Sequence, residues 1–164
     1  SRNVDPLKSG VVSCCVIETD STAHNVIPQV EKIRGTARSL DPEVRELQVQ
    51  AIRRITENTA AAFGATAELN YHYGYPVTVN HPAPTQHAVE VARSISANVD
   101  TEVAPMMGGE DFSFMLNTRP GAYIFIGNGD TANLHHPKYT FTDEAIPFGA
   151  SWLAGMIETR MPAA

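Results

Sequence analysis

The feature that most constrains this fold is one long helix with clear signals at both ends. Asp41 can accept a hydrogen bond from the first helical turn, and Pro42 suits the first helical position. Apolar residues then recur at the spacing of one helical face: Val44, Leu47, Ala51, Ile52, Ile55, Ala62 and Phe63. Gly64 stands where a left-handed cap ends a helix. The sequence therefore predicts a helix across residues 42–63.

Strand patterns lie on both sides of this helix. Residues 10–18 carry β-branched and small apolar side chains on both faces, as interior strands do. Residues 29–40 interleave charged and apolar side chains, which predicts a strand with one wet face that includes Arg38. Residues 68–75 alternate aromatic and polar residues and predict a strand with one aromatic face. The order is therefore strand, strand, helix, strand.

That order matches the last four elements of the ferredoxin-like β-α-β-β-α-β motif. We therefore expect residues 1–81 to form an incomplete ferredoxin-like domain that lacks its opening strand and helix. A proline-rich passage, residues 76–84, marks the change to a second domain. After it we expect a helix across 85–97, strands near 101–104 and across 122–127, and a closing helix across 145–158. This alternation predicts a small α/β layer for residues 82–164.

Composition excludes several classes of partner. The net charge is −6 and there is no basic run, so neither nucleic acid nor an anionic membrane surface is expected. No stretch approaches the ~20 consecutive apolar residues of a membrane helix. Cys14 and Cys15 are adjacent on a predicted strand, where their side chains point to opposite faces and a disulfide would be strained. We expect them to be reduced core residues of a cytoplasmic protein.

Two segments carry the residue types on which chemistry most often depends. The first is a glycine turn with carboxylates, Met106-Met107-Gly108-Gly109-Glu110-Asp111-Phe112. The second is a histidine-bearing loop, Leu134-His135-His136-Pro137. They flank the predicted strand 122–127, and loops held by a rigid strand are common places for chemistry.

These two segments belong to a set of four that occur in a characteristic order. The set consists of Asn25-Val26-Ile27-Pro28, Gly35-Thr36-Ala37-Arg38-Ser39-Leu40-Asp41, Met107-Gly108-Gly109-Glu110-Asp111-Phe112, and Leu134-His135-His136-Pro137 followed by Asp143-Glu144-Ala145-Ile146-Pro147. Together they resemble the amidohydrolase branch of the M20 metallopeptidases. That branch includes hippurate hydrolases, N-acyl-amino-acid amidohydrolases and hydrolases of indoleacetyl-amino acids. The resemblance extends over essentially all 164 residues.

The resemblance implies a two-domain enzyme whose catalytic α/β domain is interrupted by a ferredoxin-like lid and holds two divalent metal ions. Zinc, manganese, cobalt and nickel all suit such a centre. Only His135 matches a metal ligand of the family, and it is preferred to His136 because relatives with one histidine here read Leu-His-Ser-Pro. The family's Cys-Gly-His motif, paired glutamates and lid histidine have no counterpart in this chain. We therefore expect a C-terminal portion that contains no catalytic residue and is inactive alone.

The resemblance also implies substrate contacts. Arg38 matches a lid arginine that clamps the carboxylate of the acyl-amino acid, whereas from the residues alone it would be a solvated strand arginine. Asn25 matches a lid asparagine that approaches the substrate, and an asparagine that simply turns the chain before Pro28 is equally compatible. Gly108 and Gly109 would let the backbone approach the substrate closely or adopt positive φ.

The remaining carboxylates and histidines are not expected to take part in the chemistry. Glu110 and Asp111 are expected to cap a helix beginning at Glu110, in preference to acting as an acid–base pair. The Asp143-Glu144 pair is expected to be the N-terminal charge of the closing helix. The histidines for which no metal role is expected are His24, His72, His81 and His87.

The activity implied is metal-assisted hydrolysis of the amide bond of N-acyl-amino acids. Residues 1–81 would grip the substrate, and residues 82–164 would supply one metal ligand and the pocket floor. The alternative is a non-catalytic interaction module, because lids of this family commonly dimerise. A homodimer formed through the lid is therefore the expected assembly.

Overall fold

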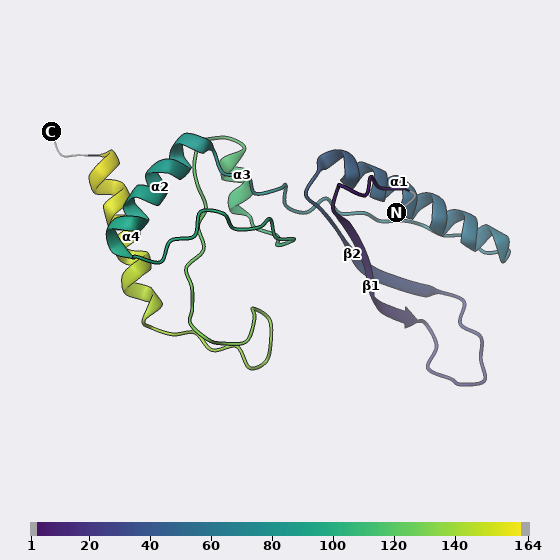
Figure 1. The fold of residues 1–164 in the computed structure, drawn as a ribbon. Helices are drawn as coiled ribbons and strands as arrows, with labels where there is room; N and C mark the ends of the chain where they lie inside the picture. Colours follow the sequence, from purple (N-terminus) through teal and green to yellow (C-terminus); the bar gives the residue numbers. More distant parts are fainter. Residues whose placement is uncertain (1–2, 162–164) are drawn as a thin grey trace. The chain divides into compact units, whose positions relative to one another are not determined.

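A computed structural model describes residues 3–161 (Figure 1). Its elements are β1 (Gly10–Thr19), β2 (Glu31–Ser39), α1 (Pro42–Ala62), α2 (Pro82–Ile95), α3 (Phe112–Leu116) and α4 (Ala145–Arg160). The described residues thus form a mixed α/β structure with a two-stranded sheet and four helices. None of these helices is both long enough and apolar enough to cross a bilayer.

The chain divides into two compact units. The first consists of Ser1–Val77 and Pro105–Glu110, and the second of Thr78–Ala104 and Asp111–Ala164. The boundary predicted after residue 81 lies four residues beyond the first change of unit. Residues 106–110 of the glycine turn, which the sequence predicted to lie in the second domain, group with the first unit, and Asp111 and Phe112 group with the second.

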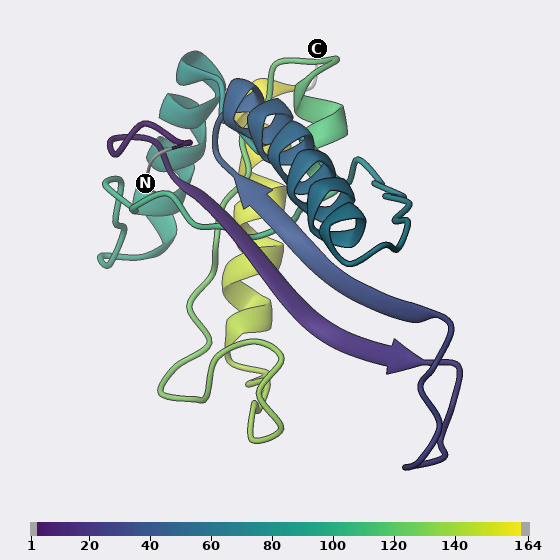
Figure 2. The same cartoon turned by 90° about the vertical axis from the view of Figure 1, so that its right-hand side faces the viewer.

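In the first unit, β1 and β2 form an antiparallel pair and α1 packs on one face of it (Figure 2). The register runs from Gly10 opposite Ser39 to Thr19 opposite Glu31, with an irregularity between Cys14 and Val16. At this point a Cβ on residue 35 would lie 2.2 Å from the carbonyl oxygen of Ser13, so only glycine fits. Both strands predicted before the helix are therefore confirmed.

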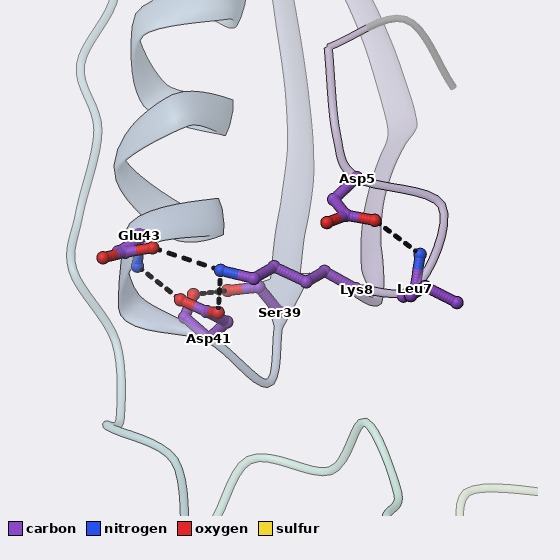
Figure 3. Close-up of polar contacts among 6 residues, drawn as sticks. All are labelled: Asp5, Leu7, Lys8, Ser39, Asp41 and Glu43. Carbon is purple, nitrogen blue, oxygen red and sulfur yellow. Dashed lines mark hydrogen bonds and ion pairs between the residues drawn. The ribbon is translucent and has the colours of Figure 1, made fainter.

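Helix α1 begins as predicted. The Asp41 carboxylate accepts the backbone N–H of Glu43 at 2.7 Å, and the ammonium of Lys8 lies 2.7 Å from Asp41 and 3.1 Å from Glu43 (Figure 3). Hydrogen bonding to these two carboxylates raises the pKa of Lys8, and hydrogen bonding to Lys8 lowers the pKa of Asp41. Beyond the C-terminal end of α1, Gly64 has a φ of 71° and ends the helix.

Within residues 3–161 the strands predicted at 68–75, 101–104 and 122–127 do not form, so these predictions are wrong. A strand forms only where a neighbour satisfies its backbone N–H and C=O groups. The segment 68–75 is instead bound to α1 at its C-terminal end, where Arg45 donates to the carbonyl of Tyr75 at 2.7 Å. The described sheet therefore lacks the third strand that the ferredoxin-like interpretation requires.

In the second unit, α2 packs against α4. The indole of Trp152 donates to the carbonyl of Ala88 at 3.1 Å, and a Cβ on Gly155 would lie 2.8 Å from Val91, so glycine permits this close packing. The side chain of Asn80 bonds both the N–H and the carbonyl of Tyr123 at 2.8 Å. A side chain thus takes the place of a neighbouring strand beside residues 122–127.

Little of this chain is buried. The exposed surface is 13,236 Å², whereas two compact domains of half the mass would together expose about 9,600 Å². No residue of α4 is buried in the described structure. Four of its large apolar side chains are 47–60% exposed: Ile146, Phe148, Leu153 and Ile157. Cys14 and Cys15 are free and exposed, so the expectation that they are core residues is wrong. The small described sheet has one covering helix and cannot bury both faces.

Candidate functional site

The structure brings Arg38 to the glycine turn within the first unit. Arg38 lies opposite Val11 near the end of β2, and its guanidinium donates to the carbonyl of Met107. Gly109 packs on the ring of Tyr75, where an added Cβ would lie 3.2 Å from Cδ2, whereas the space around Gly108 is open. Neither glycine has a positive φ, so close approach is the property that this turn uses.

The charge of Arg38 is available to a ligand. Among residues 3–161 its guanidinium has a carbonyl partner and no carboxylate partner. Arg34, four residues before Arg38 on β2, is neutralised by Glu18 at 2.6 Å. A guanidinium has five N–H donors in a planar fork, so one carbonyl leaves donors for a carboxylate. Arg38 therefore combines a free positive charge with a fixed backbone position.

Asn25 is not brought to this place. It lies exposed in the connection between the two strands, where Val26 N–H bonds the carbonyl of Ala23 at 3.4 Å in a turn. Val11, the partner of Arg38, and Thr19, at the other end of β1, are eight residues apart, or about 26 Å along a strand. Asn25 lies in the connection that follows Thr19, and among residues 3–161 no hydrogen bond joins it to Arg38 or to the glycine turn. The turn-forming alternative for Asn25 agrees with the hydrogen bond.

His135 lies in the second unit, on a loop closed by side-chain clamps. The Asn128 side chain donates to the carbonyl of Thr140 at 2.6 Å and accepts the N–H of Thr142 at 2.8 Å. The Thr131 hydroxyl accepts the N–H of Thr140 at 3.0 Å. Residues 128–142 therefore form a loop whose neck is fixed by hydrogen bonds, with His135 near its middle.

The two histidines of this loop differ. His135 is exposed and has a φ of 67°, the only positive φ of a non-glycine residue among the described residues. Such a conformation is uncommon and marks local strain. His136 is committed to the turn, because its N–H donates to Asn133 and its Nδ1 accepts the N–H of Lys138 at 3.1 Å. Only His135 presents both ring nitrogens.

An open apolar hollow of about 270 Å³ lies at the base of the loop. It is lined by Ile126, Asn128, Tyr139, Phe141, Ala145, Ile146 and Gly149. Asn128 therefore both clamps the loop and borders the hollow. Sequence reasoning missed this residue, because Asn128-Gly129 reads only as a turn signal.

The residues of this chain do not by themselves fit a complete metal centre. Within residues 3–161 there is no group of three or more histidine, cysteine, aspartate or glutamate side chains placed to hold an ion. A catalytic zinc ion usually takes three protein ligands and a water. Of the metal ligands that the sequence predicted, the described residues contain His135, which is exposed on its loop.

The acidic residues predicted at the starts of two helices have different outcomes. Helix α3 begins at Phe112, after Asp111, whose side chain makes no capping hydrogen bond, so the capping prediction for Asp111 is wrong. Asp143 and Glu144 directly precede α4, as predicted for the N-terminal charge of this helix, and Glu144 makes no side-chain capping hydrogen bond. The hydroxyl of Thr142 accepts the N–H of Glu144 at 3.4 Å instead.

Comparison with known proteins identifies the class to which this fold and these residues belong. Residues 5–159 match peptidase family M20/M25/M40, and the chain belongs to this family. It is 36% identical over 163 residues to the putative amidohydrolase YhaA of Bacillus subtilis, covering 94% of this chain and 40% of that protein. It is 34% identical over 156 residues to the hippurate hydrolase of Campylobacter jejuni, with the same coverage.

A solved structure agrees with this assignment. The Bacillus subtilis YXEP protein, described as a dinuclear metal-binding peptidase of the M20 family, matches with a TM-score of 0.74 and 30% identity. The match covers 94% of this chain and 43% of that one. The chain thus spans about two fifths of the length of the relatives that it matches.

Proposed function

We propose that this chain is part of a metal-dependent amidohydrolase that cleaves the amide bond of N-acyl-amino acids, and that the 164 residues alone are inactive. Membership of the M20 family and the similarity to a hippurate hydrolase support a hydrolase acting on acylated amino acids. The small set of metal-ligating side chains supports inactivity, because one imidazole cannot hold a catalytic ion in place.

The observation that carries this proposal is the pairing of Arg38 with the carbonyl of Met107. It places an unneutralised guanidinium beside Gly108 and Gly109, so a planar carboxylate could bind in two-pronged fashion next to an open stretch of backbone. In this proposal, residues 1–81 are an incomplete ferredoxin-like lid that grips the carboxylate of the substrate. Asn25 keeps its predicted substrate role only as an expectation.

The second part of the proposal concerns residues 82–164. His135 would donate one imidazole ligand to a centre that holds zinc, manganese, cobalt or nickel, and the hollow bordered by Asn128 and Ile126 would be the pocket floor. When bound, divalent ions polarise a carbonyl and make a bound water acidic. The contribution of this chain is to position the imidazole of His135. The left-handed backbone of His135 leaves its side chain exposed, and the hydrogen bond to His136 stabilises the turn.

The proposal is tested with two proteins, the 164-residue chain and the complete polypeptide of the gene that encodes it. Hippurate hydrolysis and bound metal are measured for each, before and after dialysis against a chelator. We expect the complete polypeptide to hydrolyse hippurate only when metal is bound and the 164 residues to be inactive. Activity of the 164 residues alone would contradict the claim that their centre is incomplete.

A second candidate function is a non-catalytic interaction module that pairs as a homodimer through the first unit. The observation in its favour is the large exposed apolar surface, which includes Ile17 and Ile33 on the two strands, 66% and 58% exposed. If neither protein hydrolyses hippurate or binds metal while sedimentation shows a dimer, this second function is the correct one.

A further inference from the structure

A buried amide joins α1 to the strand that carries Arg38. Gln48 lies on the face of α1 that packs on the sheet and is only 5% exposed. Its Nε2 donates to the carbonyl of Arg38 at 3.2 Å and to the carbonyl of Val11 at 3.4 Å. Val11 and Arg38 are direct partners in the register, so one side chain holds both members of this pair.

The amide holds Arg38 from the side opposite its side chain. A Cβ on Gly10 would lie 2.8 Å from Gln48 Nε2, so the position occupied by Gly10 and its partner Ser39 faces α1. Side chains alternate along a strand, and Arg38 therefore points to the other face. Its guanidinium donates there to the carbonyl of Met107. Gln48 thus bonds the backbone carbonyl of Arg38 from one face of the sheet, and the guanidinium of Arg38 bonds the carbonyl of Met107 on the other face.

The fold satisfies only one half of this amide. The Oε1 atom of Gln48 is buried and has no hydrogen-bond partner among the described residues. A buried oxygen without a partner is unfavourable, and an apolar side chain of the same length would fill the place without one. Side chains that break such a rule are expected at functional sites. The position of Gln48 beside Arg38 is consistent with this expectation.

We propose that Gln48 is a positioning residue for Arg38, which sets where the guanidinium meets the substrate carboxylate. This inference rests on the proposed function, in which Arg38 binds that carboxylate. Fixing the carbonyl of Arg38 fixes the direction in which its side chain leaves the strand. A charged fork that is displaced by a fraction of an ångström cannot bond both oxygens of a carboxylate well.

The test uses the complete polypeptide and two substrates, hippurate and hippuramide, in which a neutral amide replaces the carboxylate. Gln48→Met removes the amide and keeps the length of the side chain. Gln50→Met is the matched control, because Gln50 is exposed on the same helix. We expect Gln48→Met to lower the preference in kcat/KM for hippurate over hippuramide about tenfold, chiefly through KM. The melting temperature should stay equal or rise, and the control should change neither quantity.

Further measurements separate positioning from a merely structural role. In the Arg38→Ala background, Gln48→Met should leave the remaining preference unchanged, because the group that it positions is gone. Equal losses on both substrates, or an unchanged preference, would overturn the inference.

If the complete polypeptide hydrolyses neither substrate, the proposed function is refuted. The role of Gln48 is then tested by a measurement that does not depend on activity. The Nε–H signal of Arg38 in an NMR spectrum, identified by its loss in Arg38→Lys, then decides about Gln48. A shift of this signal toward free arginine in Gln48→Met, and not in Gln50→Met, supports positioning. An unchanged signal overturns it.

Discussion

The two units place their candidate functional residues by different means. In the first, Arg38 lies on a hydrogen-bonded strand pair. Its backbone carbonyl accepts a hydrogen bond from Gln48 of α1, and its guanidinium donates to the carbonyl of Met107. In the second, His135 sits on a loop that side chains of Asn128 and Thr131 close at the neck, and its own backbone is strained. The first arrangement defines a position before any ligand binds. The second leaves an exposed imidazole, which in the proposed function would bind a metal ion that sets its final geometry.

The largest effect should come from the second unit, because a metal centre tolerates the loss of a ligand poorly. In the complete polypeptide, His135→Ala should lose bound metal and reduce hippurate hydrolysis by more than about 100-fold, since even residues that only orient metal ligands account for about 10–100-fold. His136→Ala is the control and should keep its metal, because the Nδ1 of His136 is already bonded within the turn. Metal content by elemental analysis checks both. Equal metal loss in the two variants would show that the two histidines are not distinguished as the loop geometry indicates.

The first unit should give the next largest effect. Arg38→Ala in the complete polypeptide should lower kcat/KM for hippurate by about 10- to 100-fold, the equivalent of about 1.5–3 kcal/mol for hydrogen bonds to a charged group. Arg34→Ala is the matched control, because Arg34 lies on the same strand but is already paired with Glu18 on the surface. Steady-state kinetics would contradict the carboxylate grip if the two variants behaved alike.

The same contrast between the units explains what could be predicted from the sequence. Helix α1 was predictable because its cap, its apolar period and its terminating glycine are all local signals. Residues 122–127 have an equally clear strand pattern, yet among the described residues they meet the Asn80 side chain and no neighbouring strand. A pattern of alternation says which residues can form a strand and does not say whether a partner strand is present.

The candidate site divides in the same way. Arg38 and the glycine turn could be found because the family resemblance joined two segments that are 69 residues apart, and the structure brings these segments together. Gln48 and Asn128 could not be found, because a side chain that bonds a distant backbone leaves no period in the sequence. Such residues become visible only through burial and hydrogen bonds.

The smallest expected effect concerns the N-terminal anchor of the first unit, in which Lys8 bonds Asp41 and Glu43 (Figure 3). The pKa of Asp41 is lowered by its hydrogen bond to Lys8, so its stabilising contribution is present above the ordinary value of 3.8 and is lost as pH falls through the lower folded pKa. The pKa of Lys8 is raised, so its contribution is present below 10.5 and is lost as pH rises through the higher folded pKa. Between these limits the anchor should be insensitive to pH.

Lys8→Met should therefore lower the melting temperature slightly at pH 7 and flatten the decline in stability at both extremes of pH. Lys32→Met is the control, because Lys32 has no ion pair within residues 3–161 and should leave the pH profile unchanged. Thermal unfolding followed by circular dichroism across the pH range measures both. Because the anchor is exposed, 0.5 M salt should reduce the difference between Lys8→Met and the parent protein. A difference that survives high salt would mean that Lys8 stabilises the first unit through packing of its methylene chain against α1 and not through its charge.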